Sequence, residues 1–352
     1  KTAYEISKRD WSSDVCSSDL VRAVERSMAA TGVAWRDRTV VVAVSGGADS
    51  TFLLHAACAL RRRFGHDIVA AHVDHGWRGE QSHEDARAVA RLGADFGVPV
   101  HVMAVPTGQK ALRDGGIEAS ARAIRYGYLA DVARGCAAVA VLAAHTADDQ
   151  AETIILSLLR GRSVAGLVGM TAVAQLPVTG APGAVLVRPM LGLRADHVRA
   201  TLRDHQVRWR EDSSNDDRAR ARNRVRHDVV PVLEAISPGF RRALARAARD
   251  VEELRDVLDN AAGTAIARWD RVQDGWSVRR VEWLSDALVV RLAALREILL
   301  RVGVRFEAIE SAHLDAIARM VATNRGGARR TVDRAVVALI GGHLVVTAPK
   351  VG

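Results

Sequence analysis

Short apolar runs alternate with longer amphipathic segments along the first half of the chain. Residues 39–44, TVVVAV, form a continuous β-branched run of the kind found in strands that are buried on both faces. Three similar runs follow, over 67–73, 99–105 and 138–144. A helix is predicted after each of the four runs, over 49–63, 81–96, 117–134 and 148–160. This alternation predicts βαβ units, and therefore a parallel sheet with helices on both faces.

The pattern changes after Gly161. A stretch rich in Gly and Pro, 161–183, leads to a predicted helix over 194–206, and residues 211–224 are too polar for a core, which predicts a loop. Farther along, helical spacing of apolar residues predicts three helices, over 240–266, 281–302 and 306–323. Two β-rich runs within 331–346 are separated by Gly341 and Gly342, which predicts a small β-hairpin.

These patterns predict two domains behind a short leader. Residues 11–20 are polar, show no period and lack the apolar core of a secretion signal, so residues 1–20 are expected to be a non-native or disordered leader. We place an α/β domain at 21–230 and a mainly helical domain, with its hairpin, at 231–352. A chain of 352 residues is long enough for two such domains.

Composition narrows the class of protein. A hydrophobic fraction of 49% with 26% charged residues excludes a largely disordered chain. No apolar run approaches the roughly 18–20 residues of a membrane span, so no membrane partner is expected. The cysteines at 16, 58 and 136 form no CxxC pair, which favours a reducing cytoplasm. The net charge of +9, carried mostly by Arg, is compatible with a polyanion partner or with codon bias alone.

The clearest chemical signal lies directly after the first predicted strand. It consists of six consecutive residues: Ser45, Gly46, Gly47, Ala48, Asp49 and Ser50. Two glycines permit a sharp turn, and the following helix offers free N–H groups to an anion such as a phosphate. A carboxylate in such a loop suggests a bridging cation. The loop lacks the Lys of a Walker A motif. The alternative is a plain Gly-rich turn capped by Ser45 or Asp49.

This loop resembles the SGGxDS signature of the N-type ATP pyrophosphatases, the PP-loop superfamily. Further motifs resemble those of the tRNA(Ile)-lysidine synthetase family and follow its order over positions 40–235. They are HVDHGWR at 72–78, EASAR at 118–122 with Arg125 and Tyr126, HTADDQAET at 145–153, Gly166-Leu167 with Gly169-Met170, RPML at 188–191, EDSSN at 211–215 and RNRVRH at 222–227. Trp77 and Met190 stand where this family usually has Leu, and both replacements are apolar.

The resemblance implies a fold, an activity and partners. The fold is the α/β PP-loop fold, followed by a helical domain that would grip tRNA. The implied enzyme uses ATP, with Mg²⁺, to adenylate the wobble cytidine of an isoleucine tRNA that has a CAU anticodon. Free L-lysine then replaces the C2 oxygen, which gives lysidine. A cytoplasmic location follows, and the oligomeric state stays open, a homodimer being one option.

The same resemblance assigns the candidate site residues. ATP would bind to the loop at 45–50 and to His72 and Asp74, with Mg²⁺ on Asp49. Asp149 and Glu152 lie three positions apart on one predicted helix face, where they would receive the lysine ammonium and its proton. The alternatives are a solvated loop for Asp74 and helix capping for the carboxylates, Asp148 above all.

The remaining candidates are basic or polar. Arg222 and Arg226 would stabilise transition-state charge or contact the tRNA backbone, together with Asn223. A second group would bind tRNA or the triphosphate: Arg78, Glu118, Arg122 and Arg125. For the arginines on predicted helices the alternative is a solvated basic face. Cys58 and Cys136 are expected to be buried small hydrophobes rather than nucleophiles.

Two other functions remain open. The first is another PP-loop enzyme, such as a tRNA thiolase or an amidotransferase-coupled synthetase, against which the lack of CxxC and of a glutaminase domain argues. The second is a nucleotide-sensing tRNA-binding protein without catalysis, against which Asp49, Asp149 and Glu152 argue.

Overall fold

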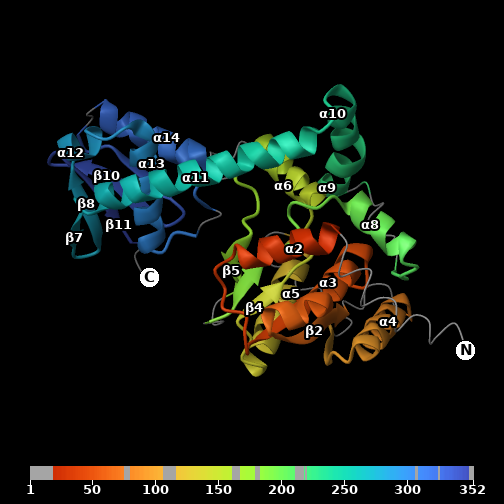
Figure 1. Cartoon of the computed structure of the whole chain (residues 1–352). Helices are drawn as coiled ribbons and strands as arrows, with labels where there is room; N and C mark the ends of the chain where they lie inside the picture. Colours follow the sequence, from red (N-terminus) through yellow and green to blue (C-terminus); the bar gives the residue numbers. More distant parts are fainter. Residues whose placement is uncertain are drawn as a thin grey trace, which may run out of the picture. The chain divides into compact units, whose positions relative to one another are not determined.

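The computed structural model describes most of the chain. The described residues are 19–74, 80–105, 116–160, 167–178, 183–210, 218, 220–305, 308–323 and 326–348, with side chains left out at 80–83 and 116–119. They fall into two compact units (Figure 1), the first made of Lys1–Thr153 and Met170–Ala245, the second of Ile154–Gly169 and Arg246–Gly352. Most of the predicted leader lies outside the described residues, and helix α2 begins at Asp19.

The first unit is built on a six-stranded sheet of order β3-β2-β1-β4-β6-β5. Its strands are β1 (Thr39–Ala43), β2 (Asp67–Asp74), β3 (Val100–Ala104), β4 (Ala140–Leu142), β5 (Val173–Gln175) and β6 (Val185–Val187). All neighbours pair in parallel except β5, the antiparallel edge strand. The crossover helices are α3 (Ala48–Phe64), α4 (Glu80–Phe96), α5 (Gly116–Gly135) and α6 (Ala147–Leu159). The predicted fold class is therefore confirmed.

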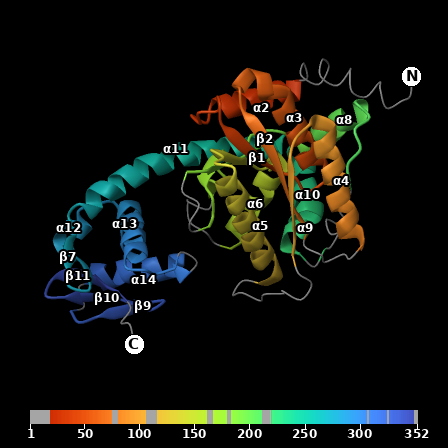
Figure 2. The ribbon, with the colours of Figure 1, turned by 90° about the horizontal axis from the view of Figure 1, so that it is seen from below.

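Helices cover both faces of this sheet because successive residues of β1 point to opposite sides. Val40 and Val42 pack in one core with Phe52 of α3. Val41 packs in another core with Leu129 of α5. Figure 2 shows β1 and β2 between α2 and α3 on one side and α5 on the other. Helix α2 (Asp19–Ala29), which the sequence analysis did not predict, adds Val21, Val24 and Met28 to the first core.

After the sheet the chain continues through four helices and a π-helical turn. They are α8 (Ala195–Asp204), α9 (Ala221–Arg224), the π-turn η2 (Val225–Val229), α10 (Val230–Ile236) and α11 (Phe240–Ile266). The predicted loop over 211–224 is wrong at its end, because α9 is helical, while 211–217 lie outside the described residues. In η2 the Val230 N–H bonds to the Val225 carbonyl, five residues back. Pro231 has no N–H to continue an ordinary helical ladder, which accounts for the wider turn.

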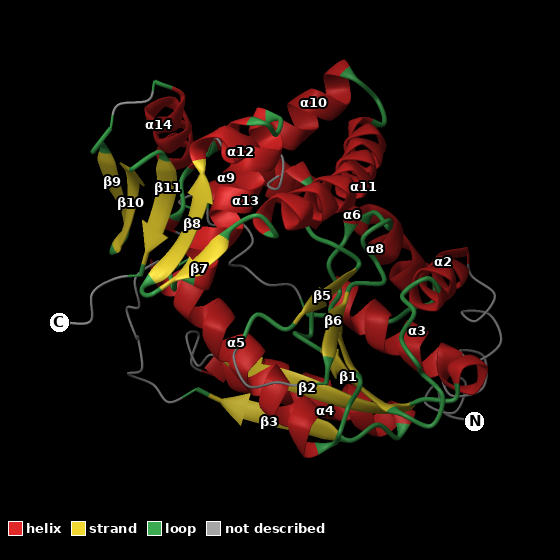
Figure 3. Cartoon of the chain, turned by 90° about the vertical axis from the view of Figure 1, so that its left-hand side faces the viewer, coloured by secondary structure: helices red, strands yellow, loops and turns green. Residues whose placement is uncertain are grey.

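The second unit combines helices with an antiparallel sheet of order β7-β8-β11-β10-β9 (Figure 3). Its elements are β7 (Asp270–Val272), β8 (Gly275–Arg279), α12 (Arg280–Leu284), α13 (Leu288–Arg301), α14 (Ser311–Ala322), β9 (Arg329–Val332), β10 (Ala335–Ile340) and β11 (His343–Thr347). The predicted hairpin is confirmed as β10 and β11, in a sheet larger than expected. The single helix predicted over 281–302 is two helices, α12 and α13. No described helix combines the length and the apolar character needed to cross a membrane.

Candidate active site

The loop between β1 and α3 folds back on its own side chains. The Ser45 N–H donates to Ser50 Oγ over 3.1 Å, and Ser50 Oγ donates to the Gly47 carbonyl over 3.1 Å. Gly46 has φ +89°, a conformation that favours glycine, and its carbonyl accepts the Arg210 N–H over 2.9 Å. Within the described part of the chain, no side chain caps the N-terminus of α3. The N–H groups of its first turn therefore remain suited to an anionic ligand.

Asp49 stands in the first turn of α3 with an unsatisfied carboxylate. Its Oδ1 is buried and has no hydrogen-bond partner among the residues that the structure describes. Burial, and then the charge of Asp149, raises the pKa of Asp49 to about 6, although Arg199 opposes this. The described residues contain no group of three or more His, Cys, Asp or Glu that could hold a metal alone. Asp49 fits a Mg²⁺ ion whose other ligands are phosphate oxygens and water.

The carboxyl end of β2 lies beside this loop. His72 is buried, and its Nδ1–H donates over 2.8 Å to the carbonyl of Val44, the residue directly before Ser45. Its Nε2 is buried and finds no partner within the described part of the chain. Asp74 ends β2 and is also buried. Both predicted nucleotide residues thus lie at the sheet edge where ligands of such folds bind, whereas Arg78 lies outside the described residues.

The first two turns of α6 carry three carboxylates, which have different surroundings. Asp148 accepts the N–H of Ala195, the first residue of α8, over 2.8 Å and lies 2.9 Å from Arg241 Nε. It therefore caps a different helix from its own. Asp149 Oδ2 accepts the N–H and the hydroxyl of Thr146 over 2.9 and 3.1 Å, which caps α6 itself. Glu152 is almost fully buried.

Two arginines from α9 and η2 meet these carboxylates. Arg222 Nε donates to Glu152 Oε2 and Arg226 Nε donates to Glu152 Oε1, each over 2.6 Å. Arg222 Nη2 also donates to Asp149 Oδ1 over 3.0 Å, and Arg226 Nη2 lies 3.5 Å from the same oxygen. Burial works against the charge of Arg226, yet the bond to Glu152 and both carboxylates raise its pKa. The structure therefore brings together four predicted site residues. The two arginines lie 70 or more positions after the carboxylates in the sequence.

His145 and Arg188 are further residues at this site that the sequence analysis did not assign. Burial lowers the pKa of His145 to about 4, despite Asp149, and the nearby arginines add to this. Its ring is therefore neutral at physiological pH. Arg188, whose pKa burial lowers, donates to the Thr171 carbonyl over 2.7 Å. Both residues belong to the motifs HTADDQAET and RPML quoted above. Membership of these motifs was the sequence signal from which a place at the site could have been predicted.

The other predicted residues are not among those that contact Asp149 or Glu152 in the hydrogen bonds described above. Asn223 is buried on α9. Arg122 and Arg125 are exposed on α5, and the Arg122 guanidinium lies 4.9 Å from the centre of the Tyr126 ring. The side chain of Glu118 lies outside the described residues. A role in contacting tRNA therefore stays a prediction for these residues.

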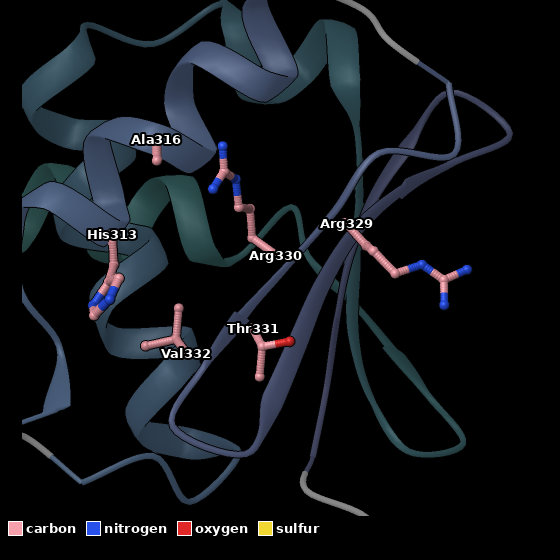
Figure 4. Close-up of a pocket in the computed structure, with 6 residues that line it drawn as sticks. All are labelled: His313, Ala316, Arg329, Arg330, Thr331 and Val332. Atoms are coloured by element: carbon pink, nitrogen blue, oxygen red, sulfur yellow. The ribbon is translucent and has the colours of Figure 1, made fainter.

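A separate hollow of about 400 Å³ lies in the second unit (Figure 4). Its lining residues are His313, Ala316, Arg329, Arg330, Thr331 and Val332. Figure 4 shows Arg330 extending toward the helix that carries Ala316, while Arg329 points to the opposite side of β9. The lining is basic and contains no carboxylate, so it lacks the groups that a lysine-binding or metal-binding site needs.

The sequence of this chain is similar to that of a known domain family and of several named proteins. The chain matches the PP-loop domain family over residues 20–233. It is 41% identical over 217 residues to the tRNA(Ile)-lysidine synthase of Porphyromonas gingivalis, covering 61% of this chain and 45% of that protein. It is 39% identical over 289 residues to the tRNA(Ile)-lysidine synthase of Salinispora tropica, covering 82% and 84%.

Some relatives are much longer than this chain, and one solved structure shares its fold. The chain spans only 45–61% of the length of the first relatives it matches, such as those from P. gingivalis and Treponema pallidum. The solved U34-tRNA thiolase NcsA from Methanococcus maripaludis shares the fold, with a TM-score of 0.56 at 16% identity over 68% of this chain and 81% of that one. From the PP-loop match and the Salinispora relative together, the chain belongs to the tRNA(Ile)-lysidine synthase family of PP-loop proteins.

Proposed function

We propose that this protein ligates free L-lysine to the wobble cytidine of an isoleucine tRNA with a CAU anticodon, using ATP. The observation that carries the proposal is one arrangement. A phosphate-binding turn with an unsatisfied Asp49 carboxylate lies within electrostatic reach of a cluster made by Asp149, Arg226 and their partners. This arrangement supports a nucleotide site next to an anionic site for an ammonium group, as a reaction between ATP, a base and lysine would require.

The first step transfers AMP to the base. The cytidine O2 attacks the α-phosphorus of ATP, the bond to the bridging oxygen breaks, and pyrophosphate leaves. The loop N–H groups and the guanidinium groups of Arg222 and Arg226 stabilise the charge on the leaving pyrophosphate. Asp49 would hold Mg²⁺, which supplies further neutralisation of the phosphate charge.

The second step forms the new C–N bond. The lysine ε-amine attacks C2 of the adenylated cytidine, and AMP leaves with the former O2. The ammonium group must give up one proton before the attack, which Asp149, the more exposed of the two carboxylates, would accept, and the second amine proton passes to water after the C–N bond has formed. His72 and Asp74 would line the nucleotide pocket at the end of β2.

Recognition of the tRNA is assigned to basic surfaces. We assign contacts with its phosphates to Arg122 and Arg125 on α5 and to Arg329 and Arg330 beside the hollow of the second unit. An exposed anticodon loop lets the base enter the site, because single-stranded loops can splay their bases outward. A cytoplasmic location and an Mg²⁺ requirement belong to the same proposal.

A thiolation reaction has less support than lysine ligation. Burial raises the pKa of the Cys58 thiol to about 12 and also raises that of Cys136, so neither described cysteine is a ready thiolate. The direct experiment incubates the protein with ATP, Mg²⁺, labelled lysine and a CAU isoleucine tRNA. Label that enters the tRNA only when ATP is present supports the proposal. Sulfur incorporation from a thiol donor, with no label from lysine, would contradict it.

A further inference from the structure

We propose that the two α6 carboxylates have different roles. Glu152 is a positioning residue that anchors Arg222 and Arg226, while Asp149 is released to the lysine ammonium when nucleotide phosphates take the outer N–H groups of those arginines. Nucleotide binding would thereby create the lysine site. This inference rests on the proposed function and adds the order and coupling of binding to it.

Glu152 has the features of a fixed anchor. Its side chain is 1% exposed, so an incoming ammonium group cannot reach it without first displacing an arginine. Both of its oxygens accept an Nε–H over 2.6 Å, one from Arg222 and one from Arg226. Charge-assisted bonds of this length, buried from water, fix the planes of both guanidinium groups. Removing this carboxylate would leave two partly buried cations without their main partner.

Asp149 has the features of an exchangeable partner. Its side chain is 18% exposed, and its Oδ2 is held by Thr146, which leaves Oδ1 as the oxygen that faces the arginines. The contacts of Oδ1, at 3.0 Å to Arg222 Nη2 and 3.5 Å to Arg226 Nη2, are longer than the two Nε bonds of Glu152, and Arg226 Nη2 also donates to Glu152 Oε2 over 3.2 Å. A phosphate oxygen can therefore compete with Asp149 for the Nη2–H groups while both Nε groups, and the guanidinium planes, stay fixed on Glu152.

Charge balance explains why this exchange couples two ligands. Without nucleotide, two carboxylates face two guanidinium groups, so the cluster offers little net attraction to a third cation. A triphosphate carries several negative charges and competes with Asp149 for the arginines. Once the phosphates have taken these N–H groups, Asp149 Oδ1 is left with an uncompensated charge that an ammonium group satisfies. Lysine therefore binds more tightly to the nucleotide complex than to the protein alone.

The coupling can be measured on the unmodified protein. Isothermal titration calorimetry gives the Kd of L-lysine with and without saturating α,β-methylene-ATP and Mg²⁺, an analogue that cannot release pyrophosphate. We expect lysine to bind at least tenfold more tightly with the analogue, within the roughly 5- to 150-fold range usual for coupled sites. Lysine must tighten analogue binding by the same factor. Norleucine, which lacks the ammonium group, should show no such coupling.

Two conservative variants separate the two carboxylates. Asp149→Asn should weaken lysine binding at least tenfold and remove the coupling, while analogue binding stays equal or becomes tighter because the arginines lose a competing partner. Glu152→Gln should weaken analogue binding at least tenfold, because the guanidinium groups lose their anchor. The matched control is Arg224→Gln, which lies with Arg222 on α9 but is exposed, and which should leave both dissociation constants unchanged. Circular dichroism checks that each variant is folded.

The outcomes distinguish this inference from the proposed function. Equal lysine affinity with and without the analogue would overturn the exchange, even if labelled lysine still enters tRNA. A reversed pattern, in which Asp149→Asn weakens the analogue and Glu152→Gln weakens only lysine, would overturn the assignment of roles. Failure of labelled lysine to enter tRNA would instead contradict the proposed function.

Discussion

The raised pKa of Asp49 predicts that this residue lowers stability near neutral pH. Burial raises its pKa from 3.8 to about 6. Below pH 3.8 the carboxyl group is protonated in both the folded and the unfolded chain. Asp49 therefore does not lower the free energy of unfolding in this range. Between these two values the unfolded chain releases its proton while the folded chain keeps it. The stability that protonated Asp49 allows is therefore lost as the pH rises through about 6.

The substitution Asp49→Asn removes this titration and should stabilise the protein above pH 6. The difference between 3.8 and about 6 corresponds to at most about 3 kcal/mol, at roughly 1.4 kcal/mol for each pH unit. Partial access of water to the site reduces the expected gain to about 2 kcal/mol. The same variant should lose Mg²⁺-dependent nucleotide binding, so stability and function change in opposite directions.

The assay is urea unfolding of both proteins from pH 4.5 to pH 8. We expect the free energy of unfolding of Asp49→Asn to exceed that of the parent by about 2 kcal/mol at pH 8, with a gap that narrows toward pH 4.5. Asp95→Asn, an exposed aspartate on α4, is the control and should change stability by less than about 0.5 kcal/mol at both ends. A gap that is independent of pH, or a less stable Asp49→Asn at pH 8, would refute the reasoning.

Three further substitutions test single features. Gly46→Ala should destabilise the protein by about 1–2 kcal/mol in urea because of its φ of +89°, and an unchanged midpoint would argue against this conformation. Phe52→Ala, in a fully buried position, should cost about 3–5 kcal/mol, and a loss below 1 kcal/mol would contradict its place in the core. Asp148→Ala removes the cap of α8 and should lower the free energy of unfolding by about 1–2 kcal/mol, whereas a neutral effect would contradict the cap.

The α/β part of the fold could be predicted because its central strands, such as β1 and β4, are buried on both faces. A continuous apolar run such as TVVVAV is typical of a fully buried strand. A helix predicted after each such run implies that neighbouring strands are parallel. The short strands β5 and β7 have three residues each, too few for a pattern to emerge. Helix α2 did carry a usable signal, with Val21, Val24 and Met28 at helical spacing.

The members of the site could be predicted, but their pairing could not. The motifs placed Asp149 and Glu152 on one helix face and Arg222 and Arg226 on a distant segment. Only the fold shows that both Nε groups converge on Glu152, since this depends on the π-turn and on the three-dimensional course of the chain between positions 152 and 222. Likewise, spacing indicated that Asp148 could cap a helix, but it could not show that the helix is α8.

One measurement tests the central claim most directly, namely the fate of ATP in a single turnover with a CAU isoleucine tRNA and labelled lysine. The account predicts one AMP, one pyrophosphate and one lysine incorporated at the wobble cytidine for each tRNA modified. Release of ADP and phosphate, or pyrophosphate release with no lysine in the tRNA, would contradict it.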